Sequence, residues 1–167
     1  MNRNVRKLVF CGMFIALIFA ATYFTKIPLP GAGYFNAGDC MIILGSAVLG
    51  PVWGAVCAGV GSALSDLIAG YGVYVPITLI VKALMGVAIG LILKKKTLPR
   101  SIISAFVSEI IMVLGYFLAE TFVFDAATAT AGVLGNLAQG GVSVVLGIVL
   151  LAIVTKNTAI KTYISKI

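Results

Sequence analysis

The residues of this chain that could do chemistry begin with the segment Tyr-Phe-Asn-Ala-Gly-Asp at 34–39. Two further unusual segments follow, Leu-Gly-Pro at 49–51 and Gly-Val-Gly-Ser-Ala-Leu-Ser-Asp at 59–66. Aromatic, amide and carboxylate groups therefore interrupt a sequence that otherwise consists of long apolar runs. A carboxylate near lipid hydrocarbon is costly unless it is paired or faces a wet cavity, so its presence indicates a site rather than a simple membrane anchor.

The elements that must position these residues are membrane helices. Of the 167 residues, 61% are hydrophobic and 10% are charged, whereas a soluble domain carries about 25% charged residues. The length suits roughly six spans of about 20 residues joined by tight loops, and it leaves no room for a soluble catalytic domain. We therefore expect an all-α integral membrane protein with six transmembrane helices and a single membrane domain over residues 1–167.

The basic residues predict the topology. The net charge of +7 does not indicate a nucleic-acid partner, because the lysines and arginines cluster at the ends of apolar runs, as they do in cytoplasmic loops. The three clusters fall at 3–7, 94–100 and 156–166. Two clusters lie on the same side of the membrane only if an even number of spans separates them. A single helix over 40–64 would give three spans between the first two clusters, so this stretch must hold two helices that meet at Gly50-Pro51. Both termini are then expected in the cytoplasm.

Six helices are expected on this reasoning, over residues 8–25, 38–49, 51–69, 76–93, 101–121 and 132–155. The second is short for a full span at about 1.5 Å per residue, so we expect it to start within protein rather than in lipid. The segment 27–38 is rich in proline and glycine, and we expect it to form a loop that closes over a site as a lid. An outer turn at 70–75 and an outer loop at 122–131 complete the topology.

Small residues four positions apart lie on one helix face and let two helices approach closely. Such pairs are Gly50 and Gly54, Gly86 and Gly90, and Ala16 and Ala20. The three cysteines form no Cys-x-x-Cys pair and are expected to be packing residues. Histidine is absent, which removes imidazole as a metal ligand, and no metal or cofactor is expected.

Most of the buried polar residues fall in the outer half of the predicted bundle. They are Tyr34, Asn36, Asp39, Tyr71, Tyr74, Lys82, Glu120, Asn136 and Gln139. Aromatic rings with a few hydrogen-bonding groups suit a small planar polar ligand. Because the polarity is one-sided, it favours capture of a ligand from outside over a continuous pore. The strongest candidates for ligand contact are Tyr34, Asn36, Asp39, Tyr74, Lys82, Asn136 and Gln139.

The sequence leaves several of these roles open. Lys82 either contacts the ligand or neutralises Asp39 or Asp66. A structural or solvated role fits Glu109 as well as a functional one, and for Glu120 a solvated position at the membrane edge competes with a role in the site. The amides three residues apart on the last helix are compatible with ligand binding and with hydrogen bonds between helices. Tyr71 and Tyr74 likewise fit either a binding site or the aromatic belt of a membrane protein.

An enzymatic function is not expected. The chain lacks Gly-x-Ser-x-Gly, His-Glu-x-x-His and phosphate-cradling motifs, which carry nucleophilic, zinc and nucleotide chemistry. An energy source must therefore come from other subunits or from an ion gradient.

The order and spacing of several motifs resemble the substrate-binding S components of energy-coupling factor (ECF) vitamin transporters. The motifs are Asn-Ala-Gly-Asp at 36–39, Leu-Gly-Pro-Val-Trp-Gly at 49–54, Gly-Ser-Ala-Leu-Ser-Asp-Leu at 61–67, Gly-Tyr at 70–71 and Pro-Ile-Thr-Leu-Ile-Val-Lys-Ala-Leu-Met-Gly at 76–86. The Ala16-x-x-x-Ala20 pair resembles the small-residue motif of that family's first helix. The resemblance covers nearly the whole chain and is weaker after Lys94.

This resemblance implies a six-helix S-component bundle in the cell membrane with both termini cytoplasmic. It implies that the chain captures a vitamin or vitamin precursor outside, and that its first helix docks through Ala16 and Ala20 on a membrane scaffold subunit. Two ATPase subunits would drive release inward. The motif pattern is closest to members that handle pyridoxine or hydroxymethylpyrimidine. Alternatives are a pantothenate, riboflavin or folate S component, an ion-gradient-driven transporter in which Glu109 and Glu120 carry protons, a membrane enzyme and a structural assembly protein.

Overall fold

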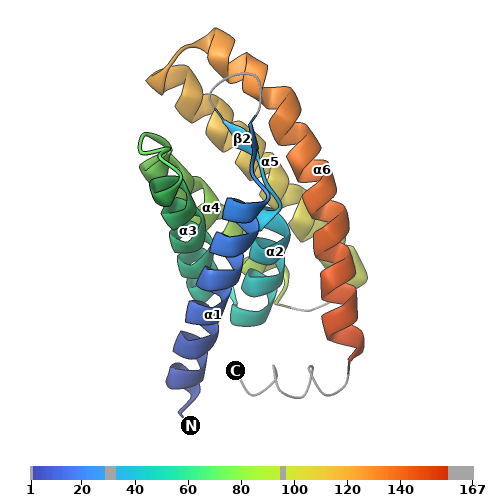
Figure 1. The fold of residues 1–167 in the computed structure, drawn as a ribbon. Helices are drawn as coiled ribbons and strands as arrows, with labels where there is room; N and C mark the ends of the chain where they lie inside the picture. Colours follow the sequence, from blue (N-terminus) through green and yellow to red (C-terminus); the bar gives the residue numbers. More distant parts are fainter. Residues whose placement is uncertain (1, 29–32, 95–96, 158–167) are drawn as a thin grey trace.

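The structure is a computed structural model that describes residues 2–28, 33–94 and 97–157. Six helices and one short hairpin make up the described chain (Figure 1). In chain order they are α1 (Arg3–Phe24), β1 (Ile27–Pro28), β2 (Tyr34–Phe35), α2 (Gly38–Leu49), α3 (Pro51–Ile68), α4 (Tyr74–Ile92), α5 (Leu98–Val123) and α6 (Ala126–Lys156). The predicted all-α bundle of six helices is confirmed.

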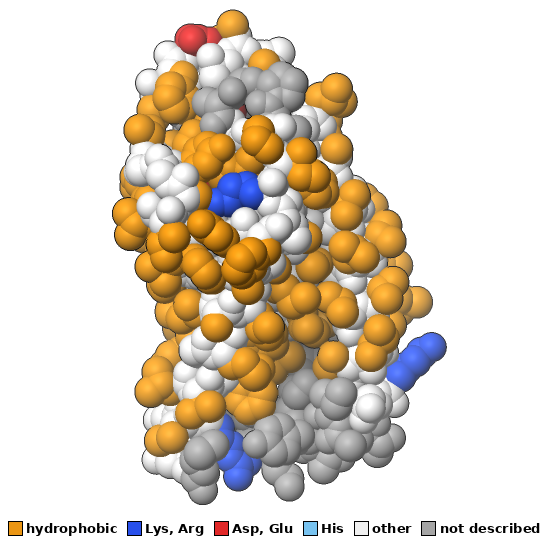
Figure 2. All heavy atoms as spheres, viewed as in Figure 1, with side chains coloured by type: hydrophobic (Ala, Val, Ile, Leu, Met, Phe, Trp, Pro, Cys, Tyr) orange, Lys and Arg blue, Asp and Glu red, His pale blue; other side chains and the backbone are white. Residues whose placement is uncertain are grey.

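Five of these helices are long and apolar enough to cross a membrane, and α2 is the shorter sixth. Figure 2 shows hydrophobic side chains over most of one face of the bundle, with lysine or arginine side chains in its lower part and one more in its upper half. The 12 residues of α2 span only about 18 Å, less than the roughly 30 Å of a hydrocarbon core. The chain is thus a multi-pass membrane protein.

The short helix α2 lies at the centre of the bundle, in contact with α1, α3, α4 and α6. Its side chains Ile42 and Ile43 pack with Ile18 of α1 and with Met85 and Ile89 of α4 in the hydrophobic core. Because protein rather than lipid surrounds it, a helix of this length satisfies its apolar surface without spanning the membrane.

The turn between α2 and α3 consists of Gly50, whose φ of 80° is readily adopted only without a Cβ. Pro51 follows as the first residue of α3, where its missing N–H is not needed. Helices α3 and α4 pack very closely. A Cβ on Gly86 would lie 2.6 Å from the carbonyl oxygen of Gly54, and one on Gly90 would lie 2.3 Å from the nitrogen of Pro51. Two of the predicted small-residue pairs therefore serve one helix–helix contact.

Two connections differ from the sequence-based expectation. The segment expected to be a plain loop contains an antiparallel hairpin that pairs Ile27 with Phe35 and Pro28 with Tyr34; its residues 29–32 lie outside the described part of the chain. The outer loop expected at 122–131 is far shorter, because α6 begins at Ala126. The physical reason is the N-cap residue Asp125, whose Oδ1 accepts a hydrogen bond from the Thr128 N–H at 2.7 Å.

Candidate functional site

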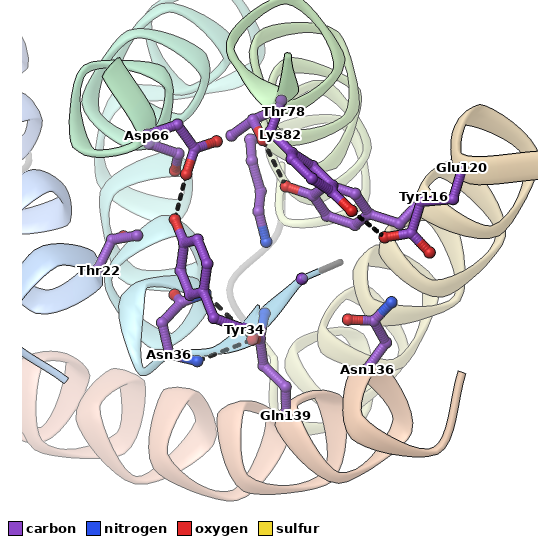
Figure 3. Close-up of a pocket in the computed structure, with 13 residues that line it drawn as sticks. Thr22, Tyr34, Asn36, Asp66, Thr78, Lys82, Tyr116, Glu120, Asn136 and Gln139 are labelled. Carbon is purple, nitrogen blue, oxygen red and sulfur yellow. Dashed lines mark hydrogen bonds between the residues drawn. The ribbon is translucent and has the colours of Figure 1, made fainter. Parts of the chain in front are cut away.

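A small cavity lies between the hairpin and the hairpin-side ends of α1, α3, α4, α5 and α6 (Figure 3). Its free volume is about 30 Å³, enough for one or two water molecules. The lining residues are Thr22, Gly33, Tyr34, Asn36, Ser62, Asp66, Tyr74, Thr78, Lys82, Tyr116, Glu120, Asn136 and Gln139. A cavity lined by so many polar side chains inside an apolar bundle requires partners for those groups.

An ion pair forms the floor of the cavity. The Nζ of Lys82 lies 2.5 Å from Oδ1 of Asp39, and both side chains are almost fully buried. The Nε2 of Gln139 donates to Oδ2 of the same aspartate at 2.6 Å. Both oxygens of Asp39 are thus satisfied, and α2, α4 and α6 are joined at one point.

The same network holds the hairpin against the bundle. The Oε1 of Gln139 accepts two hydrogen bonds from Asn36, one from its backbone N–H at 2.9 Å and one from its Nδ2 at 3.1 Å. Asn36 follows β2 directly and also accepts from the backbone N–H of Gly38 through its Oδ1. The end of the hairpin is therefore fixed to α6 and to the start of α2.

Tyr34 closes the cavity from the hairpin side. Its hydroxyl donates a hydrogen bond to Oδ1 of Asp66 on α3, and its ring packs on Tyr71 with centroids 4.9 Å apart. Burial, reinforced by the nearby charge of Asp66, raises the pKa of the Tyr34 phenol. Above it the ammonium of Lys26 lies 4.8 Å from the Tyr34 ring centroid and 4.7 Å from that of Tyr23. Burial lowers the pKa of Lys26, while Asp66 acts in the opposite direction.

The opposite wall carries Glu120 on α5 together with Tyr74, Thr78 and Tyr116. The hydroxyl of Tyr74 donates to Oε1 of Glu120 at 2.9 Å, and Thr78 and Tyr116 share a hydrogen bond of 2.9 Å. The Oε2 of Glu120 is buried and has no hydrogen-bond partner among the described residues. The same holds for the hydroxyls of Thr22 and Ser62. Thr22, Ser62 and Glu120 all line this cavity, and buried polar groups without partners are where a ligand would supply them.

Six of the seven residues that the sequence singled out for ligand contact line this cavity: Tyr34, Asn36, Tyr74, Lys82, Asn136 and Gln139. Asp39 does not line the cavity, but it holds two lining side chains in place, Lys82 through an ion pair and Gln139 through a hydrogen bond. In Figure 3 the side chain of Asn136 points toward Glu120 and Tyr116, and it makes no hydrogen bond to another described residue. Their contact with a ligand stays a prediction.

Sequence reasoning had not named Thr22, Ser62, Thr78 and Tyr116 as ligand contacts, and it named Asp66 only within the unusual segment 59–66 and as a partner of Lys82. A usable signal was present in the four-residue spacing of polar side chains on single helix faces. This spacing places Ser62 and Asp66 on one helix face. It does the same for Tyr116 and Glu120, and for Tyr74, Thr78 and Lys82.

The remaining candidates lie elsewhere. Glu109, on α5, is buried away from this cavity and lines a separate groove between α5 and α6. Ala16 is exposed and Ala20 half-buried on the outer face of α1, opposite the buried residues Phe14 and Ile18. The predicted small-residue stripe is therefore available on the surface, and its docking role stays a prediction.

Comparison with known proteins identifies the family to which the chain belongs. Residues 2–156 match a family model described as the S component of the ECF-type riboflavin transporter. The thiamine precursor transporter HmpT of Lactococcus lactis subsp. cremoris is 27% identical over 162 residues, 93% of this chain and 92% of that protein. A protein of Pyrococcus woesei described as an uncharacterized protein in the gap 3' region is 34% identical over 128 residues, 75% of this chain and 86% of that protein. The chain therefore belongs to the family of ECF-type riboflavin transporter S components, membrane subunits that bind vitamin-type substrates for transport.

Proposed function

We propose that this chain captures a single-ring vitamin precursor of the hydroxymethylpyrimidine or pyridoxine type from outside and hands it to ECF partner subunits for ATP-driven uptake. Support comes from the cavity, in which tyrosine rings, amides and carboxylates surround a small space. Rings offer stacking area, and amides and carboxylates read ring substituents at fixed geometry. The relative HmpT, a thiamine precursor transporter, handles a substrate of the same class.

The observation that carries the substrate class is the unpartnered Oε2 of Glu120. A buried carboxylate oxygen without a donor loses the free energy of a hydrogen bond, so a ligand N–H or O–H is favoured at that point. The amino group of hydroxymethylpyrimidine supplies such a donor. Asp66 and Glu120 also oppose an anionic substituent, because like charges in a binding site are costly. Among the described residues that line the cavity, Lys82 alone carries an ammonium, and it is already paired with Asp39; the ammonium of Lys26 lies above the Tyr34 ring, outside the lining. The preferred ligand is thus unphosphorylated and rich in donors.

Binding requires the hairpin to move. Ligand pockets typically measure about 300–1,000 Å³, whereas the free volume here is about 30 Å³. The side chains that fill the space from the hairpin are Tyr34 and Asn36, and each is held by side-chain hydrogen bonds that can be broken and remade. We infer that Tyr34 and Asn36, with the described strands of the hairpin, move aside to admit the ring and return over it, as lid segments do.

The proposed partners are a membrane scaffold subunit and two ATPase subunits. The outer face of α1 supports docking, because the small side chains of Ala16 and Ala20 leave room for a partner helix at close range. In the orientation we propose, the start of α1, the loop before α5 and the end of α6 face the cytoplasm. The hairpin that covers the cavity then lies on the outward side, away from the end of the bundle where α1 starts and α6 ends (Figure 1).

Riboflavin is a second candidate, favoured by the description of the matching family. Its three fused rings and sugar-alcohol chain need a larger opening than one ring does. Its ring N–H and the hydroxyls of its chain also donate to a carboxylate, so the small cavity, rather than Glu120, is what favours a single ring over riboflavin.

Calorimetric titration of the purified subunit in detergent separates these possibilities. Hydroxymethylpyrimidine, its analogue without the amino group, pyridoxine, riboflavin and hydroxymethylpyrimidine phosphate are titrated in turn. We expect the tightest binding with hydroxymethylpyrimidine or pyridoxine, and weaker binding with the phosphate. Tight riboflavin binding with no response to either single-ring compound would overturn the substrate assignment.

The role of Glu120 is tested with Glu120→Gln and with Thr121→Val, a control at the next residue that does not line the cavity. A hydrogen bond to a charged group contributes about 1.5–3 kcal/mol, so Glu120→Gln should weaken hydroxymethylpyrimidine binding about 10- to 100-fold. The analogue without the amino group should bind both proteins alike. If Glu120→Gln weakens both ligands equally, Glu120 does not read the amino group.

A further inference from the structure

A second hollow of the molecule lies on the lipid-facing side, between α5 and α6. It has a volume of about 380 Å³ and is lined by Phe106, Glu109, Ile110, Val113, Leu114, Leu137, Gly140, Gly141 and Val144. It shares no lining residue with the cavity under the hairpin. The side chains of Phe106, Ile110, Leu114 and Leu137 are each about half exposed, so this hollow, the α5–α6 groove, is open to the hydrocarbon of the bilayer.

Two glycines make the floor of the α5–α6 groove. A Cβ on Gly140 would lie 3.1 Å from Cβ of Glu109, whereas a Cβ on Gly141 would meet nothing within 4 Å. The first glycine lets the glutamate approach α6, and the second leaves the space beside it empty. The volume matches that of small-molecule sites, about 300–1,000 Å³.

One polar group lines this otherwise apolar groove. Glu109 is 5% exposed, and neither of its carboxyl oxygens has a hydrogen-bond partner among the described residues, because the neighbouring Ser108 hydroxyl donates to the carbonyl oxygen of Ala105 at 2.8 Å instead. It lies near the middle of the 26-residue helix α5, at a depth where water does not supply partners. The Nζ of Lys82, within electrostatic range of Glu109, is engaged at 2.5 Å by Asp39 instead.

We propose that the α5–α6 groove binds a membrane-dissolved molecule with an apolar body and a protonated amine, and that Glu109 is the partner of that amine. Charge complementarity selects this occupant. A lipid acyl chain fills apolar space but brings no donor to the carboxyl group, whereas an ammonium supplies both the charge and the hydrogen bond. The site is separate from vitamin capture, and its occupant reaches it from the bilayer.

The test uses the whole subunit in lipid nanodiscs, with dodecyldimethylamine as the probe. Dicyclohexylcarbodiimide, an apolar reagent that modifies membrane carboxyl groups, is added first alone, and the modified residues are mapped by mass spectrometry of peptides. We expect Glu109 to be modified, and we expect the amine to slow that modification at least fivefold. Dodecanol, which has the same chain and no charge, should give little protection. Absence of modification at Glu109, or equal protection by dodecanol, would overturn the proposal.

Substitutions localise the effect. Gly141→Leu should fill the groove and abolish protection by the amine, while Gly12→Leu, at another helical glycine with open space beside it, should leave protection intact. Both changes replace glycine by a better helix former, so the fold is preserved. As an independent measurement, the amine should raise the melting temperature of the unaltered and Gly12→Leu proteins but not of Glu109→Gln or Gly141→Leu. An equal rise in all four proteins would show that the amine acts elsewhere and would refute the site.

Discussion

Lys82 and Asp39 form an ion pair of 2.5 Å in the interior of the bundle, with side chains only 2% and 0% exposed. The pair joins α4 to the central helix α2, and Gln139 extends it to α6 and to the hairpin. A lysine at this depth is tolerated because its charge is compensated at hydrogen-bond distance. The pair therefore connects the stability of the bundle with the geometry of the proposed ligand site.

Removing one partner of this pair should destabilise the protein more than removing both. Lys82→Met leaves Asp39 unpaired, which typically costs about 3–5 kcal/mol, whereas an apolar replacement of both residues is often close to neutral. We expect a clearly lower melting temperature for Lys82→Met and partial recovery in Lys82→Met/Asp39→Leu, measured by thermal unfolding in detergent. A Lys82→Met protein with normal stability and normal ligand affinity would exclude both a structural and a ligand-binding role.

Asn136 should affect affinity without affecting stability. Its side chain points into the cavity and makes no hydrogen bond to another described residue, so the ligand-free protein loses little when it is removed. A buried hydrogen bond to the ligand contributes about 1–3 kcal/mol, and Asn136→Ala should weaken binding about tenfold or more. Titration calorimetry and melting curves on the variant and on Asn4→Ala, at the opposite end of the bundle, check both expectations. Unchanged affinity in Asn136→Ala would remove this residue from the site.

Closure of the hairpin should weaken at high pH. The pKa of the Tyr34 phenol is raised above its ordinary value of 10 in the closed protein, first by burial and then by the charge of Asp66. The closed state therefore holds this proton more tightly than the open state. The protonated Tyr34 phenol therefore contributes fully to closure below pH 10. This contribution decreases as the pH rises above 10, where the phenol of the open state ionises.

Spin labels at Ile27 and Leu134, both exposed, report the distance between the hairpin and α6. We expect a longer distance above pH 10 in the unaltered protein and no such change in Tyr34→Phe, which lacks the ionising group. A ligand should shorten and narrow the distance distribution at neutral pH. The same pH response in both proteins would assign it to another group.

Docking through α1 should be sensitive to bulk at the small-residue stripe. Ala16→Trp places a large ring where a partner helix must approach closely, and co-purification with the scaffold and ATPase subunits should be lost. Vitamin binding by the isolated subunit should survive, since Ala16 does not line the cavity. Leu118→Trp, on the exposed face of α5, serves as the control. If Ala16→Trp abolishes vitamin binding and leaves the complex intact, the stripe does not dock.

The topology is tested with single cysteines. The three native cysteines are buried, so an impermeant reagent does not reach them and they can stay in place. A cysteine at Lys94 should resist an impermeant thiol reagent in intact cells, because positive charge marks cytoplasmic loops. A cysteine at Asp125, in the short α5–α6 connection, should react. Labelling at position 94 from outside would invert the proposed orientation.

The sequence by itself determined the membrane class, the six helices and the division of the stretch 40–64 into two helices. These features follow from local properties. Apolar length defines a span, clustered lysines mark one side, and Gly50-Pro51 ends one helix and starts the next. The four-residue polar spacing of Ser62 with Asp66 and of Tyr116 with Glu120 was equally readable, although its significance was apparent only once the helices were assembled.

The tertiary structure alone decided which polar residues meet. Asp39 and Asp66 were equivalent partners for Lys82 in the sequence, and packing of α2 against α4 selected Asp39. Glu109 and Glu120 lie on one helix, yet one faces the lipid-side groove and the other the cavity under the hairpin. Sequence spacing fixes where a side chain lies on its own helix, whereas the neighbour it meets depends on how that helix is rotated and packed in the bundle. That is why the separation of the two carboxylates required the folded chain.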